Sequence, residues 1–74
     1  MTKLPRGLSG AKCVRAFGRL GFRVVRQTGS HVILRRDGPF CQVTLLSHGA
    51  LDTGTLHGIL KKAGVAVEDF LRVV

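Results

Sequence analysis

The residues best suited to chemistry in this chain centre on His31. It follows Gly29 and Ser30 and stands before an apolar, largely β-branched run at residues 32–34. Histidine is the side chain best suited to move protons near neutral pH. Gly29 permits a positive φ or the close approach of another backbone, and the Ser30 hydroxyl can orient an imidazole or donate to a phosphate oxygen. The segment indicates an acid–base group at the start of a strand; the alternative is a half-buried or solvated histidine without a chemical role.

Three arginines lie close to this segment along the chain or across the expected hairpin: Arg26, Arg35 and Arg36. A guanidinium group can hold a phosphate with two parallel hydrogen bonds, and it can stabilise an anionic transition state. RNA supplies its own nucleophile, the ribose 2′-hydroxyl. Removal of that proton and protonation of the leaving 5′-oxygen are therefore general acid–base steps, and His31 could perform one of them without a metal ion.

The other titratable candidates are weaker. His48 is expected in a loop, where it can act as a second acid–base group, donate to a phosphate or simply be solvated, and His57 is expected on the exposed side of a helix. Cys13 and Cys41 could form one disulfide, but both fit core positions better than reactive ones. Because no C-x-x-C or H-x₃₋₅-H spacing is present, we expect no zinc site. We also expect no cofactor, since 74 residues leave no room for a large cofactor-binding cradle.

The balance of charge points to a polyanionic or acidic partner. The chain has 12 Lys and Arg against 4 Asp and Glu, a net charge of +8. Self-repulsion at this density opposes compaction, so the charge exceeds what solubility requires. Nucleic acid is the first expectation and an acidic protein the second, and both can hold. At least three of the 4 phenylalanines fit core or strand positions, so we expect recognition of phosphates and shape rather than an aromatic stacking platform.

Length and hydropathy limit the class of protein. The 74 residues allow one domain, residues 1–74, near the lower limit at which a core sustains itself. A hydrophobic content of 45% excludes a disordered chain, and no apolar run approaches membrane-spanning length. The N-terminus carries charge without a following apolar stretch, so we expect no signal peptide, a cytoplasmic protein and reduced thiols.

A helix near the N-terminus and a strand hairpin must position these side chains. Ser9 is typical of a helix N-cap, and apolar residues follow at helical spacing as far as Gly21, which ends the helix. On another side of this helix, Lys12, Arg15 and Arg19 fall within a narrow arc and form a cationic ridge beside the buried stripe. We expect these three cations to contact RNA.

Alternation of apolar and polar residues predicts the orientation of the strands. In the second strand, Val32 and Leu34 share one side while His31 faces the other. In the third strand, Val43 and Leu45 are expected to point inward. The expected strands cover residues 22–27, 30–36 and 40–46, with turns at Thr28-Gly29 and Asp37-Gly38.

A second helix is expected to begin near Thr53 or Gly54 and to end at Gly64. A short helical turn at residues 67–71 then tucks Phe70 under the core. Each helix has a single apolar stripe, so both must cover the same face of the sheet. The expected fold is α+β in the order α-β-β-β-α, with a three-stranded antiparallel sheet and both helices on one face.

Four segments follow one another along the chain at characteristic spacing: Ser9-Gly10-x-Lys12, Leu20-Gly21-Phe22, Arg26-Gln27-x-Gly29-Ser30-His31 and Gly54-Thr55-Leu56-x-x-Ile59-Leu60-Lys61-x-Ala63-Gly64. No single segment is specific, but in combination they resemble the HicA family of toxins, and the resemblance extends from about Leu4 to Phe70. The Leu45-Leu46-Ser47-His48 segment keeps the histidine of a Val-Pro-x-His pattern common in the family and lacks its proline.

The resemblance implies a double-stranded-RNA-binding-domain-like fold and the toxin of a type II toxin–antitoxin pair. It further implies a ribonuclease that cleaves mRNA, with the family's catalytic histidine at His31, and a HicB-type antitoxin that binds the toxin and masks the site. The competing interpretation is a non-catalytic module that binds double-stranded or structured RNA, which explains the charge and the fold equally well.

Overall fold

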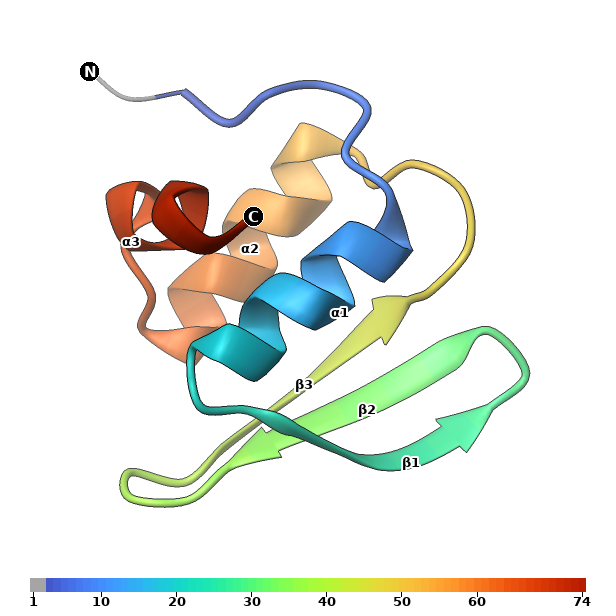
Figure 1. Ribbon diagram of the computed structural model, residues 1–74, viewed down its shortest axis with the longest axis vertical. Coiled ribbons are helices and arrows are strands. Elements are labelled where there is room, and N and C mark those ends of the chain that lie inside the picture. The colour runs from blue at the N-terminus through green and yellow to red at the C-terminus, as the bar shows by residue number, and fades with distance from the viewer. Residues whose placement is uncertain (1–2) are drawn as a thin grey trace.

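The computed structural model describes residues 3–74 of the chain. The elements are α1 (Gly10–Arg19), β1 (Arg23–Thr28), β2 (His31–Arg36), β3 (Cys41–Leu46), α2 (Thr53–Ala63) and α3 (Val67–Val73). The strands form one antiparallel sheet in the order β1-β2-β3, and the helices lie on one side of it (Figure 1). The fold is therefore α+β with the predicted α-β-β-β-α order, to which α3 is added.

Helices α1 and α2 begin and end where the sequence predicts, whereas α3 extends two residues beyond the predicted turn at 67–71, to Val73. The Ser9 hydroxyl accepts a hydrogen bond from the Lys12 amide at 3.1 Å and caps α1. At α2, the Asp52 carboxylate accepts from the Thr55 amide at 3.2 Å, and Gly64 ends the helix with a φ of 69°. Such caps satisfy backbone groups that a helix terminus leaves without partners. Within residues 3–74, no helix combines the length and apolar character needed to cross a membrane.

The core lies between the helices and one face of the sheet, here called the inner face. The inward orientation predicted for β2 and β3 is confirmed, because their alternating apolar residues are buried. Phe17 of α1 is fully buried and contacts Phe22 edge-to-face, with ring centroids 5.2 Å apart. The Phe70 ring of α3 packs against the Phe17 ring, with centroids 5.8 Å apart, so Phe70 lies in the core as the sequence predicts. The buried strand residues are Val32, Leu34, Val43 and Leu45.

The two cysteines are free and differ in environment. Cys13 lies on the buried side of α1 and is fully buried, which confirms its predicted core position. Desolvation by this burial raises the pKa of the Cys13 thiol. Cys41 is half-buried at the edge of the core, and its thiol lies 3.4 Å from the Lys62 carbonyl oxygen.

The strand boundaries depart by one residue from the predicted ones: β1 covers Arg23–Thr28 instead of 22–27, and β2 begins at His31 instead of residue 30. The third strand begins at Cys41, one residue later than expected, and the turn before it has four residues. Pro39 within that turn has no N–H to donate, so the ladder cannot begin there. On β1, every residue is exposed, and the register shifts between Val24 and Arg26, which places a bulge at Val25. Such bulges are common at sheet edges.

Candidate functional site

His31 is the first residue of β2 and is exposed. It pairs with Thr28 of β1 and with Leu46 of β3. Since Val32 points into the core, His31 points to the side of the sheet that the helices do not cover, called the outer face. By strand register this face comprises His31, Ile33 and Arg35 of β2, Arg23, Arg26 and Thr28 of β1, and Gln42, Thr44 and Leu46 of β3.

The turn before His31 is set by two residues that the sequence singles out. Gly29 has a φ of 58°, whereas no residue other than glycine has a positive φ in the part of the chain described. A glycine with positive φ at only the first central position fits a type II′ hairpin turn. The Gln27 amide group donates to the Gly29 carbonyl oxygen at 3.2 Å. The predicted need for glycine at position 29 is therefore confirmed, and the turn fixes where β2 begins.

A second contact to this turn comes from the loop that follows β3. The Ser30 carbonyl oxygen accepts a hydrogen bond from the Ser47 amide at 2.7 Å. Ser30 precedes His31 and Ser47 precedes His48, so this bond brings the segments that carry the two histidines side by side. His48 is exposed in the loop after β3, as expected. His57 is exposed on α2, away from its buried stripe, also as expected.

The N-terminus of α1 abuts the same end of the sheet through Gly10. A Cβ atom at this position would overlap the Leu46 carbonyl oxygen, so only glycine allows the helix to approach so closely. The Gly10 amide donates to the Gly49 carbonyl oxygen at 2.9 Å. From the sequence, Gly10 is identified only as part of the helix start. A glycine at this position is compatible with a close backbone approach, but the sequence does not show which residue approaches it.

The three arginines predicted to bind phosphate lie on different faces of the sheet. Arg26 lies on the outer face. It pairs with Ile33, which is two residues along β2 from His31. Arg35 shares this face but lies four residues along β2, about 13 Å from His31 at the usual rise of a strand. Arg36 belongs to the inner face: its guanidinium lies 4.9 Å from the centroid of the Phe22 ring. The structure therefore brings Arg26 toward His31 and leaves Arg36 on the other side of the sheet.

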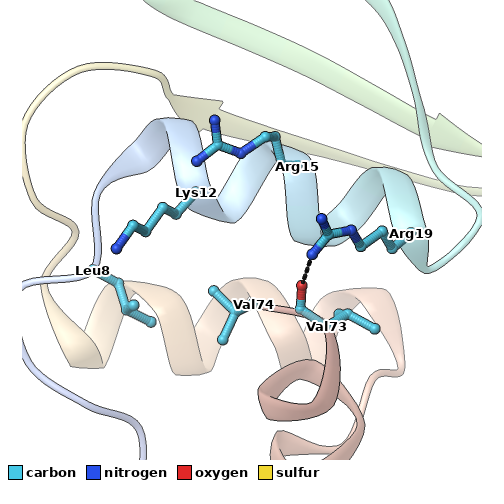
Figure 2. A pocket seen from close by; sticks show the side chains of 6 residues that line it. All are labelled: Leu8, Lys12, Arg15, Arg19, Val73 and Val74. Atoms are coloured by element: carbon cyan, nitrogen blue, oxygen red, sulfur yellow. Dashed lines mark hydrogen bonds between the residues drawn. The ribbon is translucent and has the colours of Figure 1, made fainter.

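The cationic ridge of Lys12, Arg15 and Arg19 also lies away from His31. Its side chains are exposed and line a groove between α1 and α3 with a volume of about 300 Å³. Figure 2 shows the Arg19 guanidinium pointing to the end of α3, where it donates to the Val73 carbonyl oxygen at 2.6 Å. The predicted ridge is confirmed as a feature of α1, but it borders the helical layer rather than the outer face.

No group of three or more histidine, cysteine or acidic side chains within residues 3–74 is arranged to hold a metal ion. The arrangement at His31 instead offers an exposed imidazole on a backbone held by a tight turn, a strand pair and the Ser30–Ser47 bond. With Arg26 on the same face, it can transfer a proton beside a bound anion.

Comparison with known proteins identifies the family. Residues 10–65, more than half of the chain, match the family model described as "HicA toxin of bacterial toxin-antitoxin". Comparison with curated proteins and with solved structures gave no match. The matched range includes the segment around His31, the sheet and α2. This chain belongs to the HicA family, the toxin component of bacterial toxin–antitoxin pairs, a membership that implies a HicB antitoxin as its partner.

Proposed function

We propose that this toxin is a metal-independent endoribonuclease that cleaves mRNA in the cytoplasm, with His31 as a general acid or base. The observation that carries the proposal is the position of His31, exposed on the outer face of the sheet with its backbone fixed on both sides. Family membership supports a toxin, and the +8 net charge supports a polyanionic substrate.

The proposed reaction is an intramolecular transesterification of RNA. A base removes the proton of the 2′-hydroxyl, the 2′-oxygen attacks the adjacent phosphorus, and the bond from phosphorus to the 5′-oxygen breaks. An acid protonates the leaving oxygen, so the products are a 2′,3′-cyclic phosphate and a 5′-hydroxyl. His31 supplies one of the two proton transfers, a step worth about 10²–10⁴-fold in rate.

Different cations would serve different parts of the RNA. Arg26 shares the outer face with His31, so it would bind the phosphate near the imidazole and stabilise charge in the transition state. Ser30 and the Gly29 turn would orient the imidazole. The ridge of Lys12, Arg15 and Arg19 would bind phosphates of a longer or structured RNA, because it borders a different side of the molecule.

The deciding experiment compares two exposed histidines. Wild type, His31→Ala and His57→Ala are each induced in bacteria, and each purified protein is incubated with RNA in the presence of a chelator. Both variants should fold, since both side chains are exposed. We expect growth arrest and new 2′,3′-cyclic phosphate ends with wild type and His57→Ala, and neither with His31→Ala.

Two outcomes would overturn this proposal. A fully toxic His31→Ala variant would remove the imidazole from the mechanism. RNA binding by wild type without new RNA ends would instead favour the non-catalytic RNA-binding module, for which the cationic outer face and ridge suffice.

A further inference from the structure

Phe40 is the one large aromatic side chain left open to solvent among the described residues. It is 67% exposed, whereas Phe17, Phe22 and Phe70 are each 3% exposed or less. Phe40 is the last residue of the four-residue turn between β2 and β3. The prediction that at least three phenylalanines occupy core or strand positions is therefore confirmed, and Phe40 is the one that stays outside the core.

The turn that carries Phe40 is anchored to the core. The Arg36 Nε donates to the Pro39 carbonyl oxygen at 3.3 Å, and the same guanidinium lies over the buried Phe22 ring. The residue after Phe40, Cys41, is already paired with Arg36 in the sheet. Because the backbone of the turn is already ordered, a ligand that covers the exposed ring needs to restrict only the Phe40 side chain.

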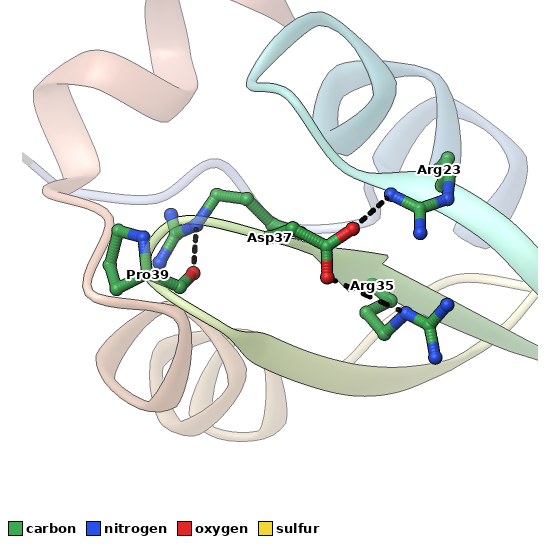
Figure 3. Close-up of polar contacts among 5 residues, drawn as sticks. Arg23, Arg35, Asp37 and Pro39 are labelled. Atoms are coloured by element: carbon green, nitrogen blue, oxygen red, sulfur yellow. Dashed lines mark hydrogen bonds and ion pairs between the residues drawn. The ribbon is translucent and has the colours of Figure 1, made fainter.

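The turn that carries Phe40 follows strand positions that are rich in arginine. Figure 3 shows Arg23 and Arg35 converging on Asp37, at 2.7 Å and 3.9 Å. A single carboxylate between two guanidinium groups leaves a net positive charge, to which Arg36 adds on the inner side. The three arginines belong to the end of the sheet where this turn joins β2 to β3, opposite His31.

We propose that Phe40 is a stacking platform for one base of single-stranded RNA, with Arg23 and Arg35 on the adjoining phosphates. This inference rests on the proposed function and adds a binding site to it. Aromatic rings beside a positively charged surface are the elements that bind single strands without reading sequence, since every base has a π-face. Double-stranded RNA keeps its bases stacked on one another and would not use this site.

The position of the ring gives the site a function in cleavage. The turn lies about six residues along the strand direction from His31, or roughly 20 Å. A base stacked on Phe40 would hold a single strand along the outer face and fix which phosphate reaches His31. Phe40 is in this sense a positioning residue, and its loss should lower the affinity for single-stranded RNA about 5- to 100-fold.

The experiment exploits the absence of tryptophan from the natural chain. Phe40→Trp places a single fluorophore at the proposed site, and the matched control Val24→Trp places one on the exposed edge strand, where Val24 is 49% exposed. Both variants carry His31→Ala so that the RNA stays intact. Each is titrated with single-stranded RNA of about 12 nucleotides, with a duplex of the same sequence, and with inorganic polyphosphate, which has charge but no bases.

We expect the single-stranded RNA to quench Phe40→Trp emission strongly and the duplex and polyphosphate to leave it nearly unchanged. The Val24→Trp control should respond weakly to all three. In a parallel titration in the His31→Ala background, Phe40→Ala should weaken single-strand affinity with an unchanged salt dependence, because a stacked base contributes no counterion release.

Equal quenching of Phe40→Trp by polyphosphate and by RNA would overturn the stacking site, as would Phe40→Ala binding RNA with wild-type affinity. A Phe40→Ala variant that binds RNA normally but loses affinity for an acidic partner protein would assign the ring to a protein interface instead. These results differ from failure of the proposed function, which would appear as wild-type protein that leaves RNA uncut.

Discussion

The outer face of the sheet and the ridge on α1 are both cationic, yet they present their charges in different ways. On the outer face, Arg26 shares a strand surface with an exposed histidine. On the ridge, Arg19 is tied to the end of α3, and the remaining side chains border a groove in the helical layer. Net charge therefore indicates a polyanionic partner without distinguishing the two surfaces, and of the two only the outer face combines a cation with His31.

The largest expected effect is on the rate of RNA cleavage and follows from removing the His31 imidazole on the outer face. His31→Ala should lower the rate of RNA cleavage by about 10²–10⁴-fold, and free imidazole added to the solution should restore part of it. The restored rate is measured against imidazole concentration at constant ionic strength. The control is an Arg15→Gln variant with His31 intact. If added imidazole raised its cleavage rate by the same factor, imidazole would be acting somewhere other than the position of His31.

The next effect separates the two cationic surfaces. Arg26→Gln should lower cleavage of a short single-stranded RNA about tenfold or more, since a charged hydrogen bond to phosphate is removed. Arg15→Gln should instead weaken the binding of long RNA and reduce the slope of log affinity against log salt by about 0.7. Cleavage kinetics on RNAs of two lengths check both; identical losses on the short RNA would mean that the surfaces act as one.

A change in stability tests the contact that joins the helical layer to the end of the sheet where His31 lies. Gly10→Ala forces a Cβ into the Leu46 carbonyl oxygen and should cost about 1–3 kcal/mol of unfolding free energy. Each 1 kcal/mol corresponds to about 4–8 °C in Tm for a domain of this size.

The matched control for Gly10 lies in the same helix. Gly18 has no atom within 4 Å of an added Cβ, so Gly18→Ala should raise stability by about 0.5–1 kcal/mol. Thermal unfolding of both variants gives the comparison, and a Gly10→Ala protein as stable as wild type would contradict the close approach.

The smallest expected effect is a difference in the alkylation rates of the two free thiols, Cys13 and Cys41. Burial raises the pKa of the Cys13 thiol, so less of it is thiolate at any pH below that pKa, and the core also excludes reagents. Alkylation at pH 8 followed by mass spectrometry should modify Cys41 before Cys13. The difference should disappear in denaturant; faster modification of Cys13 in the native protein would place it outside the core.

Local signals in the sequence predict much of this fold. The Ser9 cap, the Gly64 stop and the inward Val32 and Leu34 follow from hydrogen-bonding groups and periodicity within a few residues. The site is less predictable because its contacts join distant segments. Proximity in sequence suggests that Arg35 and Arg36 act together, but strand alternation sends them to opposite faces.

Other features of the molecule depend on structure that no short window of sequence contains. The partner that requires glycine at position 10 is a carbonyl oxygen 36 positions later, at Leu46. The bulge at Val25 is a shift in the pairing of β1 with β2, and the exposure of Phe40 is a property of the folded turn. Composition predicts phenylalanines in the core, and only the turn geometry shows which one stays outside.

The hydrogen bond from the Ser47 amide to the Ser30 carbonyl couples two histidine-bearing segments that are otherwise separate in the chain. For that amide to exchange its proton with water, the hairpin tip and the loop after β3 must part. The exchange rate of this single amide therefore measures how often the backbone that carries His31 is released from the neighbouring loop. A ligand that clamps the two segments together would slow the exchange without touching either ring.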